Sequence, residues 1–261
     1  MSTWHPYLKF SLITTNSVRR EKVKSHLWDH FQSLGDLAPT TASPGDEKAF
    51  EITSLGDDGL SAFWSGDHSI YFPVAKTGSF HLIAFPGPRA GQHVFGGRIP
   101  YESVLEAHEG LPAFLRFFEN VIDLLEAEYA CLSLVPDTRF DGWSRDAGEP
   151  DVIYEGIRID RVPVGGHRFI CPCWVSVFGE TYQRFLMDLG INVRESVHTR
   201  TLESGRAWFQ ACEEPEEAHA EVGAEAIREF YHPMVVANAC YGQPGDRRDF
   251  VRPDFDTSRL T

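Results

Sequence analysis

The stretch from residue 110 to residue 135, GLPAFLRFFENVIDLLEAEYACLSLV, indicates the fold class. Gly110-Leu111-Pro112 opens a helix, because proline is tolerated in the first turn, where its missing N–H is not needed. Apolar residues fill most of the helix circumference, which is typical of a central, buried helix. Those on its main face are Phe114, Phe118, Val121, Ile122 and Leu125. Residues 130–135 then predict a strand, so helix and sheet pack together.

Toward the N-terminus, residues 7–15 predict a strand, since alternate positions are apolar. Ser17 can cap the following helix and Gly35 can end it. Apolar residues recur within that helix at helical spacing, as Val23, Leu27, Phe31 and Leu34. Farther along, residues 70–75 and 80–85 predict two strands of a hairpin.

The C-terminal half predicts strands more often than helices. Residues 169–177 predict a strand, residues 181–189 a short helix ended by Gly190, and residues 197–201 and 206–211 a hairpin around Glu203-Ser204-Gly205. A last helix is expected from about Pro215 to Tyr231, closed by Pro233.

This order of elements predicts an α+β fold with a mixed, mainly antiparallel sheet covered by helices. We expect a single domain over residues 1–261. An alternative is a subdivision into two similar halves, 1–135 and 152–261, around the loop 136–151.

The chain is acidic, with a formal net charge of −14. Such a charge repels phosphate backbones and anionic lipids, so we expect neither direct nucleic-acid binding nor membrane binding. A basic protein partner is one reason for the acidity, and solubility is the simpler one. The segment 1–6 lacks the pattern of a signal peptide, and five cysteines form no disulfide framework. A cytoplasmic protein is therefore expected.

Motifs for nucleotide binding or hydrolysis are missing: the sequence contains no G-x-x-x-x-G-K, G-x-G-x-x-G, G-x-S-x-G or H-E-x-x-H. We therefore predict no catalytic residue, no cofactor and no metal. The one open metal hypothesis is the pair His26 and His30, four residues apart on a predicted helix, a spacing that can chelate one ion. It lacks a visible third ligand.

Two segments are candidates for contact with a partner. Glutamates crowd the last predicted helix, and only those in its first turn have a structural reason, the helix dipole. From this helix we select Glu213, Glu214, Glu217, Glu221 and Glu225. The loop 136–151 combines acids with aromatics, a composition found at binding hot spots. Its candidates are Asp137, Phe140, Asp141 and Trp143, although Trp143 could equally fill its own core.

Two stretches carry a family resemblance, GHRFICPCWV at residues 166–175 and GRAWF at residues 205–209. With the α+β layout, they make the chain similar to bacterial immunity proteins of polymorphic-toxin and type VI secretion systems (T6SS), in particular the immunity protein 52 type. That family is paired with restriction-endonuclease-fold toxins. The resemblance implies binding and neutralisation of a cognate toxin, without catalytic residues.

Acidity agrees with this interpretation, since a nuclease has a basic substrate groove. Two alternatives remain at this point. One is an enzyme with a site assembled from scattered residues, including a metal site at His26 and His30. The other is an adaptor or chaperone of a secretion system.

Overall fold

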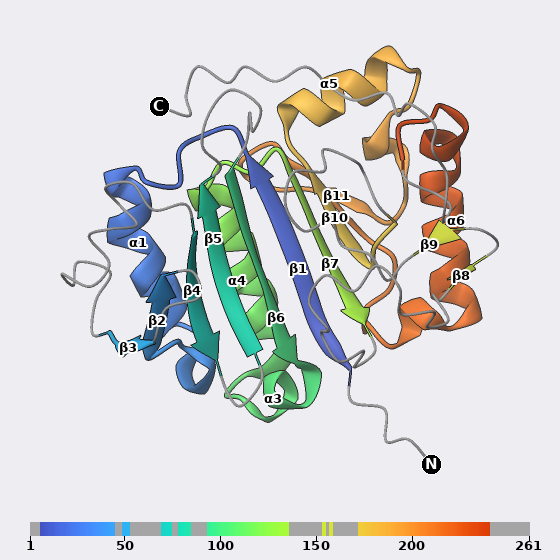
Figure 1. Cartoon of the computed structure of the whole chain (residues 1–261). Coiled ribbons are helices and arrows are strands. Elements are labelled where there is room, and N and C mark those ends of the chain that lie inside the picture. The colour runs from blue at the N-terminus through green and yellow to red at the C-terminus, as the bar shows by residue number, and fades with distance from the viewer. Residues whose placement is uncertain are drawn as a thin grey trace, which may run out of the picture. The chain divides into compact units, whose positions relative to one another are not determined.

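The computed structural model describes residues 6–44, 49–52, 69–74, 78–84, 93–135, 153–154, 157–158 and 172–240 (Figure 1). The chain divides into two compact units. Unit 1 consists of Met1–Phe10 and Glu128–Asp254, and unit 2 consists of Ser11–Ala127 and Phe255–Thr261. The first strand, β1 (Tyr7–Thr14), contributes its first half to unit 1 and its second half to unit 2.

Unit 2 combines helices with antiparallel strands that follow the order β6–β5–β4–β2–β3. Its elements after β1 are α1 (Glu21–Gln32), the 3-10 helix η1 (Gly35–Leu37), β2 (Thr41–Pro44), β3 (Phe50–Glu51), β4 (Ser69–Val74), β5 (Gly78–Ala84), β6 (His93–Pro100), α3 (Tyr101–Glu106) and α4 (Gly110–Leu124).

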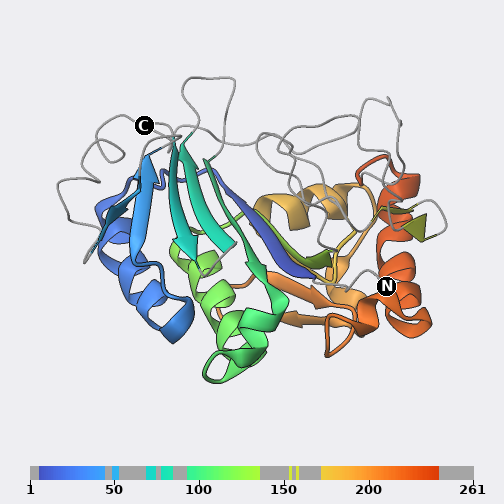
Figure 2. The same cartoon turned by 60° about the horizontal axis from the view of Figure 1, so that its bottom comes forward.

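The core of unit 2 is a cluster of phenylalanines between its helices and its sheet. Phe31 of α1 lies 5.1 Å from Phe72 of β4 and 5.2 Å from Phe80 of β5, measured between ring centroids. The same ring contacts Phe117 of α4 at 6.0 Å. Helices α1 and α4 therefore cover the same face of β4–β6, which Figure 2 shows from below.

Unit 1 has antiparallel strands in the order β11–β12–β10–β7. Its elements after β1 are β7 (Tyr129–Val135), the separate pair β8 (Ile153–Tyr154) and β9 (Ile157–Arg158), β10 (Val175–Phe178), α5 (Glu180–Asp188), η3 (Val193–Glu195), β11 (Thr199–Thr201), β12 (Ala207–Gln210), η4 (Glu217–His219) and α6 (Glu221–Val236).

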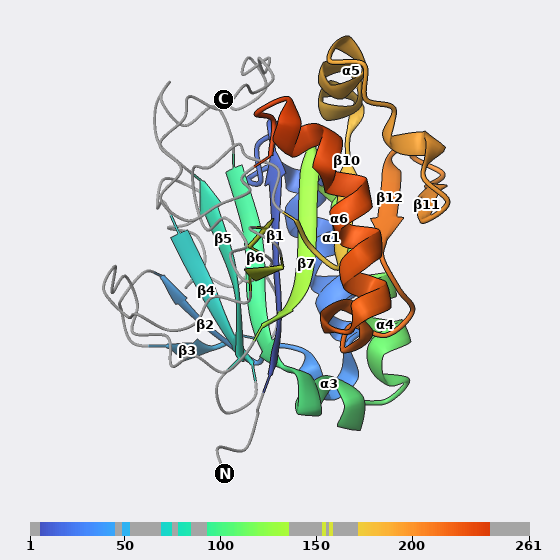
Figure 3. The same ribbon diagram turned by 90° about the vertical axis from the view of Figure 1, so that its right-hand side faces the viewer.

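Helix α6 is held against β10 and β12 by aromatic packing and one buried hydrogen bond (Figure 3). The ring of Phe230 stacks on Phe209 of β12, with centroids 3.7 Å apart and planes inclined by 8°. The next residue, Tyr231, is fully buried, and its hydroxyl donates to Oγ of Ser176 at 2.5 Å. These contacts fix which face of α6 remains exposed.

The structure confirms the predicted α+β fold and its antiparallel sheet. The predicted hairpin around residues 203–205 is present as β11 and β12, and its turn is closed by Gly205 at φ +81°, a conformation that favours glycine. The central helix α4 begins at Gly110, as expected, and its predicted main apolar face is buried. Gly190 follows α5 in the left-handed conformation.

Three predictions about helix ends are wrong. The last helix begins at Glu221 instead of Pro215, and it continues through Pro233 to Val236. Beyond its end, Asn238 adopts φ 55° and the N–H of Ala239 donates to the carbonyl of Met234, a closure that needs no proline. Ser17 does not cap α1 either: its hydroxyl accepts from the N–H of Arg19, and the helix begins after Arg20.

The loop 136–151 lies outside the described residues, so the predicted domain organisation stays a prediction. The boundary between the units falls between Ala127 and Glu128, ahead of β7. Among the helices that the structure describes, none is long and apolar enough to cross a membrane.

Candidate functional site

The predicted acidic residues of the last helix lie on three consecutive local structures of unit 1. Glu213 and Glu214 lie in the turn after β12, Glu217 begins η4, and Glu221 and Glu225 lie on the first two turns of α6. Because α6 begins at Glu221, only Glu221 occupies its first turn. The helix-dipole explanation that the sequence suggested for residues 213–217 therefore fails for α6.

The lack of a side chain at Gly223 allows the chain to turn between η4 and α6. A Cβ atom built on Gly223 would collide with the carbonyl oxygen of Glu217 and lie 2.7 Å from Cα of Ala218. The absence of a side chain at Gly223 lets η4 fold back onto the first turn of α6. Ala218 is buried at this crossing, whereas Glu217 is exposed.

All five predicted glutamates are exposed, and so are their neighbours Glu216 and Glu229. Among the described residues, no ion pair involves Glu213, Glu214, Glu217, Glu221 or Glu225. Two exposed valines, Val222 and Val236, accompany them on α6. We call residues 213–229 the acidic segment. It presents dense negative charge with some apolar surface, the combination that suits a partner with basic and apolar groups.

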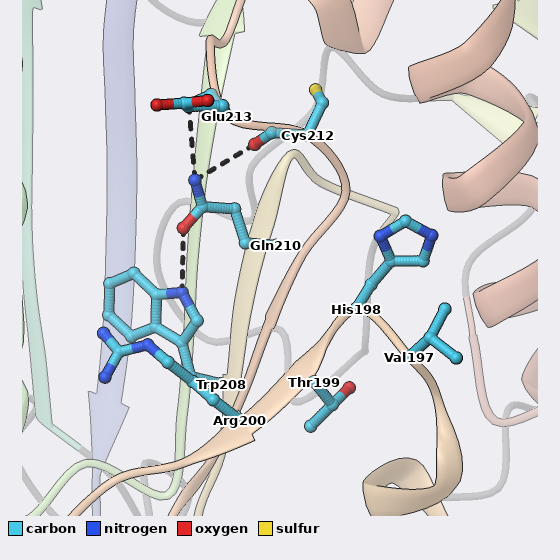
Figure 4. Close-up of a pocket in the computed structure, with 8 residues that line it drawn as sticks. All are labelled: Val197, His198, Thr199, Arg200, Trp208, Gln210, Cys212 and Glu213. Atoms are coloured by element: carbon cyan, nitrogen blue, oxygen red, sulfur yellow. Dashed lines mark hydrogen bonds between the residues drawn. The ribbon is translucent and has the colours of Figure 1, made fainter.

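A pocket of about 410 Å³ opens beside the acidic segment, at the hairpin of β11 and β12 (Figure 4). Glu213 belongs to both features. The pocket is lined by Val197, His198, Thr199, Arg200, Trp208, Gln210, Cys212 and Glu213. All eight residues belong to unit 1.

Gln210 fixes the wall of this pocket through both ends of its amide. Its Oε1 accepts from the indole N–H of Trp208 at 3.2 Å, and its Nε2 donates to the carbonyls of Cys212 at 3.0 Å and Glu213 at 3.3 Å (Figure 4). The Cys212 carbonyl also accepts from the indole of Trp174 at 2.9 Å. The backbone beneath Glu213 is thereby held in place before any ligand arrives.

Arg200 covers the inner wall of the pocket. It pairs with Trp208 across the two strands, so both side chains lie on the same face. The guanidinium carbon lies 4.7 Å from the indole centroid, a cation–π contact that leaves Trp208 only 1% exposed. At the rim, by contrast, Val197 is 94% exposed.

The pKa of the Cys212 thiol is shifted by its surroundings. Burial, the largest cause, and the nearby carboxylates of Glu217, Glu214 and Glu216 together raise the pKa of its thiol to about 11. These carboxylates therefore lie near enough to Cys212 to disfavour its thiolate form. A thiol with this pKa is almost entirely protonated at neutral pH, which makes Cys212 a poor nucleophile and a poor metal ligand. The arrangement favours binding of a cation over covalent chemistry.

No third ligand lies beside His26 and His30 among the described residues. His26 is exposed and its Nδ1 lies 2.9 Å from the carbonyl of Lys22. Burial lowers the pKa of His30, with His26 as a second cause and Asp29 opposing both. Within the part of the chain that the structure describes, no three His, Cys, Asp or Glu side chains gather where they could hold a metal ion.

The other predicted contact residues, Asp137, Phe140, Asp141 and Trp143, lie outside the described residues. The sequence reasoning also missed Arg200, Trp208 and Gln210. The predicted hairpin could have indicated two of them, because a turn centred on Ser204 places Arg200 opposite Trp208.

No protein-family profile matches the chain, and no curated protein sequence does. The fold resembles that of the Pseudomonas aeruginosa T6SS protein PA0821, with a TM-score of 0.57. The two chains are 15% identical over 86% of this chain and 76% of that chain. At this level of identity the similarity shows a shared fold.

Proposed function

We propose that this protein is an immunity protein that binds and neutralises a cognate antibacterial toxin. The toxin is a nuclease effector of a type VI secretion system that acts in the cytoplasm. The protein blocks the active site or the substrate groove of the toxin, and it acts by binding alone, without catalysis or a cofactor.

The observation that carries the proposal is the acidic segment. Five exposed glutamates there form no ion pair among the described residues, although uncompensated like charges repel one another and oppose folding. A nuclease binds a polyanion and therefore needs a basic groove. An inhibitor with a dense negative surface complements such a groove and associates with it faster than a neutral surface would.

The fold supports the assignment to a secretion system, because a protein of similar fold is described as a T6SS protein. The proposal for the partner rests on the charge and on the family resemblance of the sequence. The pocket beside Glu213 adds a concave feature, with a wall held by hydrogen bonds, to this charged surface. Preorganised pockets lower the entropy cost of binding.

Co-expression with the toxin tests the proposal. Bacteria that express the toxin encoded by the neighbouring gene should die, and those that also express this protein should grow. The two purified proteins should form a stable complex. A catalytically inactive toxin serves as the control for nonspecific growth effects. Unchanged killing together with no complex would contradict the proposal. Recovery of a secretion component in place of the toxin would favour the adaptor alternative.

A further inference from the structure

Strand β11 is the last strand in the sheet order of unit 1. Among the described strands it pairs with β12 alone (Figure 3). Its other edge carries backbone groups that face away from β12. We propose that the toxin adds an extended strand to this edge. The inference rests on the proposed function and names one contact within it.

The register of the hairpin decides which backbone groups of β11 face outward. Antiparallel pairs alternate between hydrogen-bonded and non-hydrogen-bonded positions. The N–H of Gln210 donates to the carbonyl of His198 at 3.0 Å, which makes position 198 a hydrogen-bonded one. Positions 199 and 201 are therefore not bonded to β12, and their N–H and C=O groups point away from it.

Most of these outward groups have no hydrogen-bond partner among the described residues. The N–H of Thr199 is used, since it donates to the carbonyl of Ser196 at 3.0 Å. The carbonyl of Thr199 and both backbone groups of Thr201 remain open, and Thr201 is exposed. An extended strand is the partner that supplies N–H and C=O groups at this spacing.

Hydrogen bonds hold β11 in its extended conformation from both ends. At the turn of the hairpin, the carbonyl of Gly205 accepts from Nη2 of Arg194 at 2.7 Å and from Nε2 of Gln183 at 3.2 Å. Ahead of the strand, Oγ of Ser196 accepts from the N–H of His198 at 3.2 Å. A strand that is already ordered loses little conformational entropy when a partner pairs with it.

The side chains of β11 leave its outer edge open. Proteins often protect sheet edges with proline, with bulges or with charged side chains. The register of β11 with β12 is continuous, without a bulge. Its one charged residue, Arg200, lies over the ring of Trp208 on its own hairpin, 4.7 Å from the centroid. The threonines at 199 and 201 favour the extended conformation that pairing needs.

The location of β11 favours the toxin as the partner. Val197 and Arg200 line the same pocket as Glu213, so the open edge adjoins the acidic segment that the toxin is proposed to bind. Pairing along so short a strand is too small to hold two molecules together by itself, since stable interfaces bury about 1,200 Å² or more. A second copy of this chain would also bring together two molecules of net charge −14, which repel each other.

Amide hydrogen exchange, measured by NMR, tests the inference directly. In the free protein the N–H of Thr201 should exchange rapidly, whereas that of Arg200, which faces β12, should be protected. Saturation with inactive toxin should slow exchange at Thr201 by about tenfold or more. Unchanged exchange at Thr201 in the complex would overturn the inference. Slow exchange at Thr201 in a free protein of dimeric mass would also overturn it, in favour of a second copy at this edge.

A proline variant gives an independent measurement. Thr201→Pro removes only an N–H that β12 does not use, and edge strands tolerate proline in this orientation. It should raise the dissociation rate of inactive toxin about tenfold or more, because a hydrogen bond is lost and the ring obstructs the incoming strand. Thr201→Val is the matched control. It keeps the N–H and the β-branched shape, so its dissociation rate should stay within about twofold of wild type.

The outcomes separate the inference from the proposed function. Failure of the wild-type protein to bind the toxin overturns both. Wild-type binding with equal dissociation rates for Thr201→Pro and Thr201→Val overturns the inference and leaves the proposed function standing. The thermal unfolding midpoint verifies that each variant is folded. If Thr201→Pro does not fold, amide exchange at Thr201 of the wild-type complex decides the question alone.

Discussion

His93 shows how a single residue couples stability to pH in unit 2. The N–H of Val18 donates to its Nδ1 at 2.9 Å, so the imidazole must stay neutral to accept this bond. Burial, the larger cause, and the nearby Arg19 together lower the pKa of His93 to about 4. In the unfolded chain the same group titrates near its ordinary value of about 6.5.

Stability should therefore fall as the pH drops from about 6.5 to about 4. Between these two pH values His93 is protonated in the unfolded chain and neutral in the folded protein, so proton uptake favours unfolding. Below about pH 4 it is protonated in both states. His93→Asn can accept the same bond through Oδ1 and does not titrate. Urea unfolding at a series of pH values should show a shallower pH dependence for the variant. Parallel curves for both proteins would contradict the lowered pKa.

At the scale of single elements, Gly223 sets the start of α6. Glycine is normally unfavourable inside a helix by about 1 kcal/mol relative to alanine. Here a Cβ atom would collide with the backbone of Glu217 and Ala218 in η4. Alanine therefore cannot provide the stabilisation that it usually gives a helix relative to glycine. Gly223→Ala should destabilise unit 1 by about 1–3 kcal/mol, as overpacking does.

Equilibrium urea unfolding measures this change, and Val222→Ala is the control, since Val222 is 78% exposed on the same turn. The control should stay within about 0.5 kcal/mol of wild type. A more stable Gly223→Ala protein would show that η4 does not pack against α6 as described.

Sequence reasoning succeeded where the hydrophobic period was strong and failed where tertiary packing decided. The apolar faces of α1 and α4 and the β11–β12 hairpin follow from spacing and turn residues alone. The start of α6 does not, because the break at Ala220 depends on η4 packing over Gly223, a contact between segments whose local preferences are both helical. Pro233 is likewise tolerated inside α6, although proline normally ends or kinks a helix.

The same distinction between local sequence pattern and tertiary packing applies to the candidate site. Charge density along residues 213–229 is visible in the sequence, and those glutamates are indeed exposed. The pocket is not visible, because it requires Gln210 to bridge the Trp208 side chain and the backbone at Cys212. Side chains that bond to backbone after a strand leave no periodic signal.

For the whole molecule, the central claim is that negative charge on the acidic segment brings the toxin to its binding site. Long-range attraction between opposite charges raises association rates and weakens with salt, whereas short-range packing mainly sets dissociation rates. Net charge alone, at −14, would give some attraction wherever the carboxylates lie. The claim therefore requires that charges on the acidic segment raise the association rate more than the same number of charges elsewhere on the protein.

The most direct test is the association rate with inactive toxin, measured by stopped flow over a range of salt concentrations. Reversing Glu217, Glu221 and Glu225 to lysine takes the net charge from −14 to −8, since each reversal changes it by two. Reversing the exposed Asp36, Glu102 and Glu106 of unit 2 gives a control of equal net charge. We predict that the first variant associates about tenfold more slowly at low salt, with a shallower salt dependence, than the control. Equal rates and equal salt dependence for the two variants would contradict the account.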